Sequence, residues 1–169
     1  MKFELVKSSL LSGSQATIYN VLLLDEDDMP LHKNNGTLLD NFIEENIQGY
    51  NLEVKSILDR LRIMGKKTGC RTDYFRHFEG KLGDGVCALC DIPDNNLRLY
   101  CIRYGTQIVI LGGGGMKDVG QWQQDPKLSK EASQMINIAK KLNKAIREKD
   151  LEFSDDFMDF IGDLIIELD

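Results

Sequence analysis

Two kinds of side chain in the middle of this sequence are suited to binding an anion and moving a proton. Arg98 lies in an apolar, strand-like run, and its guanidinium can donate two parallel hydrogen bonds to a phosphate. Lys117 follows the next apolar run and supplies a second cation. His77 is the histidine placed for proton transfer, because His32 lies in an early acidic loop. The pattern indicates a candidate site for phosphate chemistry.

Three further residues would extend this site towards an RNA strand. Arg76 and Lys81 lie beside His77 in a connector that precedes the apolar runs, close enough in sequence to reach the same surface. Tyr100 lies two residues after Arg98 and offers a ring on which a base can stack. We therefore take Arg76, Lys81 and Tyr100 as candidate RNA-binding residues.

Each of these candidates also has a structural alternative. Arg98 is equally suited to a cross-strand ion pair, for instance with Asp91. Tyr100 is suited to a half-buried position in a strand. His77 and Lys117 would otherwise be solvated side chains of a basic connector and a glycine loop. The sequence leaves both interpretations open.

The four cysteines favour buried thiols over a metal site. Cys87 and Cys90 have the spacing of a zinc knuckle, but they lie inside a strand-like run without the tight turn that such a knuckle needs. Cys70 and Cys101 are available in principle, yet no histidine is placed to complete the ligand set. We therefore expect no metal and no other cofactor.

The glycine run at residues 112–115 resembles a phosphate-binding loop only superficially. A Walker loop requires a Gly-Lys pair followed by a hydroxyl, whereas this run continues as Met116, Lys117 and Asp118. Nucleotide hydrolysis is therefore not indicated. The glycines instead predict a flexible crossover or a close approach of two backbones.

Charge is segregated along the chain, although the net charge is only −6. Residues 1–53 hold 3 basic and 9 acidic side chains, and residues 150–169 hold 8 acidic and no basic ones. Between them, residues 54–149 hold 18 basic and 10 acidic side chains. A basic block between acidic ends is typical of an anion-binding surface, with ordinary solvated helix faces as the alternative.

The first third of the sequence predicts a β-hairpin and two helices. In chain order, we expect a strand at residues 2–8, a strand at 16–25, a loop at 25–36 and helices beginning after Thr37 and near Asn51. Thr37 and Asp40 have the spacing of a reciprocal capping box. Gly65 is the expected end of the second helix. Short separation of the two helices predicts a helical hairpin.

The remaining sequence predicts an antiparallel meander and a long helix. We expect strands at residues 86–91, 97–104 and 107–111, a helix from the Asp125-Pro126 cap to about Lys149, and an acidic tail at 153–169. Alternation along the middle strand places Arg98 and Tyr100 opposite its apolar side, on the face that we expect to be open. The tail is compatible with a short helix capped by Ser154 or with a strand at 164–166.

This order of elements resembles the RelE/ParE toxin superfamily, specifically its HigB-like branch, over roughly residues 37–149. The stretch from Phe78 to Lys117 carries the resemblance. It contains a glycine turn at residues 79–86, the Arg98-bearing strand at 97–100 and an apolar strand at 107–111 that leads to a lysine. The branch usually has an aromatic residue or histidine and paired lysines after its third strand, where this chain has four glycines and one lysine.

The resemblance implies a fold, an activity and partners. The expected fold is α+β and RelE-like, a single domain over 1–169 with an N-terminal hairpin and loop at 1–36 and an acidic extension at 150–169. Toxins of this family cleave messenger RNA in the ribosome and are held in check by an antitoxin, here expected to be a helix-turn-helix protein. Arg98, Lys117 and His77 would then be catalytic, and Arg76, Lys81 and Tyr100 would bind RNA.

The glycine run in place of the usual aromatic and lysine residues, and the acidic tail, leave two rival interpretations. A non-catalytic protein-binding module would retain the RelE-like fold but lack the cleavage residues. Alternatively, the acidic tail at 153–169 would lie over the basic block and mask it. Because no apolar run reaches the ~18 residues of a membrane span and an acid stands where an export signal would be apolar, we expect a cytoplasmic protein without a membrane partner.

Overall fold

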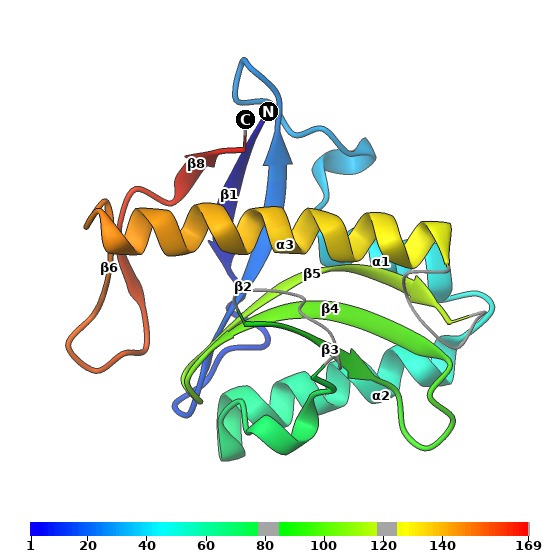
Figure 1. Cartoon of the computed structure of the whole chain (residues 1–169). Helices are drawn as coiled ribbons and strands as arrows, with labels where there is room; N and C mark the ends of the chain where they lie inside the picture. Colours follow the sequence, from blue (N-terminus) through cyan, green and yellow to red (C-terminus); the bar gives the residue numbers. More distant parts are fainter. Residues whose placement is uncertain (78–84, 118–124, 169) are drawn as a thin grey trace.

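The computed structural model describes residues 1–77, 85–117 and 125–168 as a mixed α+β structure (Figure 1). A six-stranded sheet runs in the order β3-β4-β5-β2-β1-β8, and β6 and β7 form a separate two-stranded sheet. The strands are β1 (Lys2–Lys7), β2 (Thr17–Leu24), β3 (Val86–Cys90), β4 (Leu97–Tyr104), β5 (Ile108–Met116), β6 (Leu151–Phe153), β7 (Phe160–Gly162) and β8 (Ile165–Glu167). The helices are η1 (Lys33–Asn35), α1 (Leu38–Asn46), α2 (Asn51–Ile63), η2 (Met64–Thr68), η3 (Thr72–Tyr74) and α3 (Pro126–Arg147).

The helical hairpin forms as its caps predict, except at its end. The Thr37 hydroxyl accepts a hydrogen bond from the Asp40 backbone N–H, and the Asp40 carboxylate accepts one from the Thr37 backbone N–H, so both members of the capping box are present. α2 ends at Ile63, close to the predicted stop at Gly65, but the helical path does not stop there. It continues through a π-helical turn, η2, whose C-cap is Gly69 with a φ of 74° that suits glycine.

The meander is also present, but its third strand is longer than predicted. β3, β4 and β5 are antiparallel neighbours, and a three-residue loop at 105–107, rather than the expected two-residue turn, joins the last two. β5 continues through all four glycines to Met116. The expectation of a flexible crossover at residues 112–115 is therefore wrong, and the alternative of a close backbone approach is confirmed.

A β-bulge lies within the glycine run. Leu99 pairs with Gly114 and Cys101 with Leu111, so two residues of β5 stand opposite the single residue Tyr100 of β4. A side chain at Gly114 would overlap the carbonyl oxygen of Arg98. Glycine is therefore required here by the approach of the neighbouring strand.

Both faces of the sheet are covered by helices (Figure 1). The two hydrophobic clusters follow this division. One contains β4 residues Leu97, Leu99 and Cys101 with the buried sides of α1 and α2, and the other contains Tyr100 and Ile102 with the buried side of α3. The predicted alternation along β4 is confirmed, but the prediction of an open face is wrong, because α3 packs over it. None of the described helices is long and apolar enough to cross a membrane.

The two acidic ends of the chain are integrated into the sheet. β2 pairs with β5 in parallel and joins the N-terminal hairpin to the meander, while β8 pairs with the outer edge of β1. The strand alternative for the tail is thus confirmed. Two tail carboxylates reach β1, where Asp159 pairs with Lys7 and Glu167 lies 4.0 Å from Lys2. The ion pairs of the described tail residues join β1, while Ile166 and Glu167 also line a groove beside Lys141 and Lys144 of α3 without pairing with them.

Gly114→Ala tests the close approach at the bulge. We expect the added methyl group to lower the free energy of unfolding by about 1–3 kcal/mol, because the backbone of β4 must move to accommodate it. Urea denaturation measures the change. Gly49→Ala is the matched control, since nothing lies within 4 Å of a Cβ at that position. Equal stability of the two variants would contradict the described bulge.

Candidate functional site

Arg98 and Tyr100 of β4 are both buried, and Tyr100 packs in the hydrophobic cluster that contains the inner side of α3. Arg98 is 6% exposed and Tyr100 is fully buried, so neither presents a surface to RNA. Burial raises the pKa of Tyr100 to about 12, although the nearby Arg98 guanidinium opposes that shift. Asp91, suggested as an ion-pair partner in the structural alternative for Arg98, accepts a hydrogen bond from the Leu97 backbone at 2.6 Å. The expected exposure of Arg98 and Tyr100 is therefore wrong.

The other predicted residues do not gather around Arg98. Arg76 and His77 are exposed beside the outer edge of β3, where the backbone of Arg76 exchanges two hydrogen bonds with Ala88. Lys117 follows β5 and is half-buried. No hydrogen bond or ion pair in the described structure joins His77 or Lys117 to Arg98. Lys81 lies outside the described residues.

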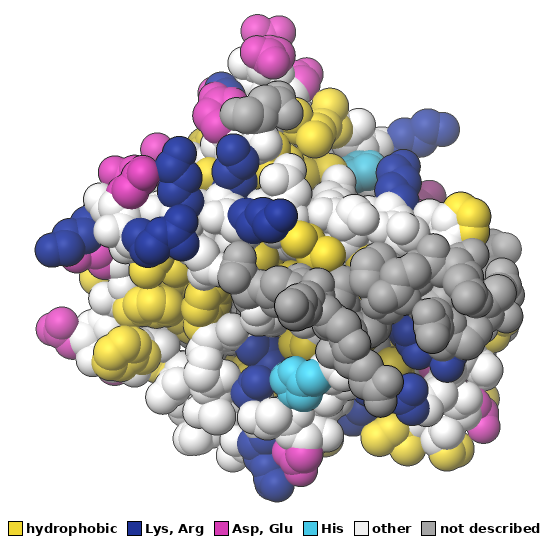
Figure 2. All heavy atoms as spheres, viewed as in Figure 1, with side chains coloured by type: hydrophobic (Ala, Val, Ile, Leu, Met, Phe, Trp, Pro, Cys, Tyr) yellow, Lys and Arg dark blue, Asp and Glu magenta, His cyan; other side chains and the backbone are white. Residues whose placement is uncertain are grey.

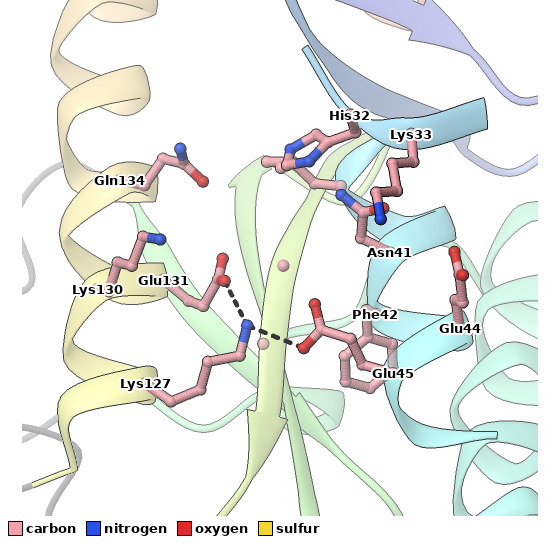
Figure 3. Close-up of a pocket in the computed structure, with 13 residues that line it drawn as sticks. His32, Lys33, Asn41, Phe42, Glu44, Glu45, Lys127, Lys130, Glu131 and Gln134 are labelled. Atoms are coloured by element: carbon pink, nitrogen blue, oxygen red, sulfur yellow. Dashed lines mark hydrogen bonds and ion pairs between the residues drawn. The ribbon is translucent and has the colours of Figure 1, made fainter. Parts of the chain in front are cut away.

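A different set of polar residues surrounds a groove between α1 and α3 (Figure 3). The groove has a volume of about 300 Å³, at the lower end of the range for small-molecule sites. Its floor is the glycine half of β5, its walls are α1 and α3, and η1 closes one end. The polar side chains around it are His32, Lys33, Asn41, Glu44, Glu45, Lys127, Lys130, Glu131 and Gln134.

Lys127 links the two walls of the groove. Its ammonium lies 3.0 Å from the Glu45 carboxylate of α1 and 2.8 Å from the Glu131 carboxylate one turn along α3. Burial lowers the pKa of Lys127, but the hydrogen bonds to Glu131 and Glu45 outweigh that effect, and the net shift is upward. The lysine therefore stays charged and ties α1 to α3 across the groove.

His32 contributes a buried ring nitrogen to the same groove. Its Nε2 atom has no hydrogen-bond partner in the described structure and is inaccessible to solvent. The ring lies near Asn41 and Lys33 at the η1 end, turned towards the cavity (Figure 3). Buried polar atoms are nearly always hydrogen-bonded, so this nitrogen is an exception among the described residues.

Sequence reasoning did not identify this groove. Glu45 and Lys127 are far apart in the sequence, and only the folding of α1 and α3 over β5 brings them together. The one local signal was the glycine run, which had indicated a close approach. His32 had been set aside because its own loop is acidic, although its neighbours in space belong to other elements.

The exposed side of α3 forms a separate basic surface (Figure 2). Cations gather over its C-terminal half, and none of those in the described part of the chain pairs with a carboxylate. We define the α3 basic row as Lys140, Lys141, Lys144 and Arg147. Unneutralised cations along one helix form a positive field that attracts anionic partners.

The cysteines are buried and far from metal-binding geometry. All four are free thiols, and no group of three metal-ligating side chains occurs in the described residues. Burial raises the pKa of Cys70 and of Cys87 to about 12, and that of Cys101 well above its ordinary value. Such thiols are protonated at neutral pH and unreactive.

Comparisons with known proteins supply no relative. No family model matches the chain, and neither the curated proteins nor the solved structures contain a significant match. The function is therefore argued from the geometry of this chain.

Arg98→Ala distinguishes a buried arginine from a surface one. We expect the substitution to lower the free energy of unfolding by about 2 kcal/mol, because it leaves a cavity and removes the polar contacts of a buried charge. Arg147→Ala, at an exposed position of α3, is the control and should change stability by less than about 0.5 kcal/mol. Urea denaturation measures both changes. If Arg98→Ala left the free energy of unfolding unchanged, Arg98 would not be buried as described.

Thiol labelling tests the buried cysteines. At about pH 8, a disulfide reagent should label the native chain far more slowly than the urea-unfolded chain, because the native thiols are protonated and enclosed. The raised pKa values also imply that unfolding free energy falls as pH rises from 9 towards about 12, since the unfolded state loses these protons first. Rapid labelling of a native thiol would contradict this description.

Proposed function

We propose that this chain is a non-catalytic protein-binding module that retains a RelE-like fold. The observation that carries the proposal is the burial of Arg98 and Tyr100, the latter in the hydrophobic cluster that α3 completes. A guanidinium at that depth supports the packing of β4 and α3 and cannot clamp the phosphate of an RNA strand. Arg98, which the resemblance makes central to cleavage, would thus have a structural role.

The element order supports the RelE-like part of the proposal. Two helices precede a three-stranded antiparallel meander, and a basic helix follows it, as the resemblance implies. The sequence departs from the HigB-like pattern at residues 112–115, and these glycines are built into β5. A strand backbone there leaves no side chains for chemistry, which agrees with loss of cleavage.

The α3 basic row supports a protein partner with an acidic surface. Proteins that hold single-stranded RNA usually add aromatic side chains on which bases stack. Among the described residues, the only strongly exposed aromatic side chain is Phe157, and it follows Asp155 and Asp156, whose charge repels phosphate. Cations without aromatic side chains for base stacking favour binding of an acidic protein over binding of RNA. An antitoxin-like protein is the expected partner.

A second candidate function is a ribosome-dependent mRNA endoribonuclease, the toxin of a toxin–antitoxin pair. Exposure of Arg76 and His77, adjacent in sequence at the edge of β3, favours it. In that case His77 would transfer the proton and Arg76 would bind the phosphate, without Arg98. Induced expression separates the two candidates.

Charge reversal on α3 tests the protein-binding proposal. We expect the wild-type chain to capture one acidic protein in a pull-down, with affinity that falls as salt rises. Lys140→Glu with Lys144→Glu should weaken that capture at least about tenfold, which is 1.4 kcal/mol. Lys66→Glu with Lys67→Glu changes the charge equally at exposed positions of η2 and should leave capture unchanged.

Two results would overturn the proposal. Capture of ribosomes or RNA in place of a protein would favour the endoribonuclease. Growth arrest on induction, relieved by His77→Ala but not by the fold-neutral Arg147→Ala, would do the same. A harmless wild-type chain that binds an acidic protein through α3 supports the module.

A further inference from the structure

The β6–β7 hairpin, residues 151–162, carries the most exposed aromatic side chain in the described part of the chain. Phe157 in its turn is 57% exposed and has a φ of 59°. This left-handed conformation favours glycine or asparagine and is uncommon for a bulky side chain. Burial does not explain a phenylalanine there, and strained backbone is often retained at functional positions. The Phe157 ring is therefore a candidate contact for a partner.

A run of aromatic rings connects Phe157 to α3. The centroid of the Phe157 ring lies 5.8 Å from that of Phe153, which lies 5.6 Å from that of Tyr104. The Tyr104 hydroxyl donates a hydrogen bond of 2.8 Å to Asn143 of α3. Figure 2 shows apolar side chains in this region, below the cations of α3. The run thus extends from the side of the helix to the surface of the hairpin.

Unpaired basic side chains adjoin the α3 end of this run. Lys140 lies three residues before Asn143 and Arg147 four residues after it, so all three share one side of the helix. Lys140 and Arg147 are exposed and form no ion pair in the described structure. The other two members of the α3 basic row line a groove beside β8 that also contains carboxylates.

Unpaired acidic side chains adjoin the hairpin end of the run. Asp155 and Asp156 immediately precede Phe157, and both are exposed. Asp159 of the same turn pairs with Lys7 of β1, whereas Asp155 and Asp156 form no ion pair among the described residues. The order along this surface is therefore basic, aromatic and acidic, and the two charged ends do not neutralise each other within the chain.

This order is self-complementary. A two-fold axis places the same patch of two copies face to face, so the basic end of each copy meets the acidic end of the other. A different acidic protein would be attracted by α3 but repelled by the acidic turn beside Phe157. A second copy matches both ends, and with a net charge of −6 it is itself an acidic protein.

We propose that this surface joins two copies of the chain in a two-fold dimer. Phe157 of each copy packs against the aromatic run of the other, and Lys140 and Arg147 pair with Asp155 and Asp156 of the other copy. The buried rings supply the affinity, and the charged rim sets the orientation. The inference rests on the proposed function, because it names a second copy as the acidic protein that binds the α3 basic row.

The mass of the full chain in solution is the first test. Sedimentation equilibrium is measured from about 5 to about 300 μM protein, the range in which small, transient interfaces dissociate. We expect a monomer–dimer equilibrium with a Kd of about 1–50 μM that weakens as salt rises. A monomer at every concentration would overturn the proposal.

Phe157→Asn tests the aromatic centre of the dimer. Asparagine adopts a φ of 59° readily, so the substitution removes the ring without straining the turn. We expect the Kd for dimerisation to rise at least about tenfold. Leu52→Asn, at a position 72% exposed in the first turn of α2, is the control and should leave the Kd unchanged. An unchanged Kd for Phe157→Asn would place any dimer contact elsewhere and overturn the proposal.

A charge swap tests the two-fold pairing. One variant combines Lys140→Glu with Arg147→Glu, and the other combines Asp155→Lys with Asp156→Asn, which keeps an acceptor for the Met158 backbone N–H. Each variant alone should dimerise at least about tenfold more weakly, because like charges then meet. An equimolar mixture should restore the dimer, since each end again meets its opposite. Circular dichroism shows that each variant is folded, and failure of the mixture to dimerise would overturn the pairing.

Capture experiments separate this inference from the proposed function. A chain that remains monomeric but captures a different acidic protein through α3 overturns the dimer and leaves the protein-binding proposal standing. A chain that captures ribosomes while its dimer still depends on Phe157 overturns the protein-binding proposal alone. Dimerisation that depends on Phe157 and is restored by the charge swap supports the dimer.

Discussion

The close packing of α3 on the glycine half of β5 is the constraint on which the rest of the structure depends. Side chains at Gly112 and Gly113 would overlap Met135 and Glu131 of the helix. Neighbouring strands normally carry side chains that hold a helix at a distance of about 10 Å between layers. Here the sheet presents bare backbone, and a helix of 22 residues lies directly against it.

This packing determines which polar side chains are buried and which line the groove. It buries Arg98 and Tyr100, which the strand alternation alone would have left on an open face. It also brings α3 beside α1, which closes the groove with Lys127 between two carboxylates. The residues predicted for phosphate chemistry are therefore not the residues that line the groove.

The sequence predicts those features that arise from local chemistry. The capping box at Thr37 and Asp40, the Asp125 cap with proline at the first helical position, and the alternation along β4 each depend on a few neighbouring residues. Coverage of the sheet face that carries Tyr100 cannot be predicted in this way. It depends on where α3 packs, and α3 is distant in sequence from β4. The bulge opposite Tyr100 likewise requires the register of two strands, which no single strand reveals.

The positions of the charged segments in space also depend on how distant parts of the chain pack together. The acidic tail adds β8 beside β1, and its carboxylates meet Lys2 and Lys7 of that strand. The α3 basic row forms no ion pair in the described structure, although Glu148, Asp150 and Glu167 line a groove beside Lys141 and Lys144. An acidic surface that settles on this row would gain the Coulomb energy that the tail does not supply.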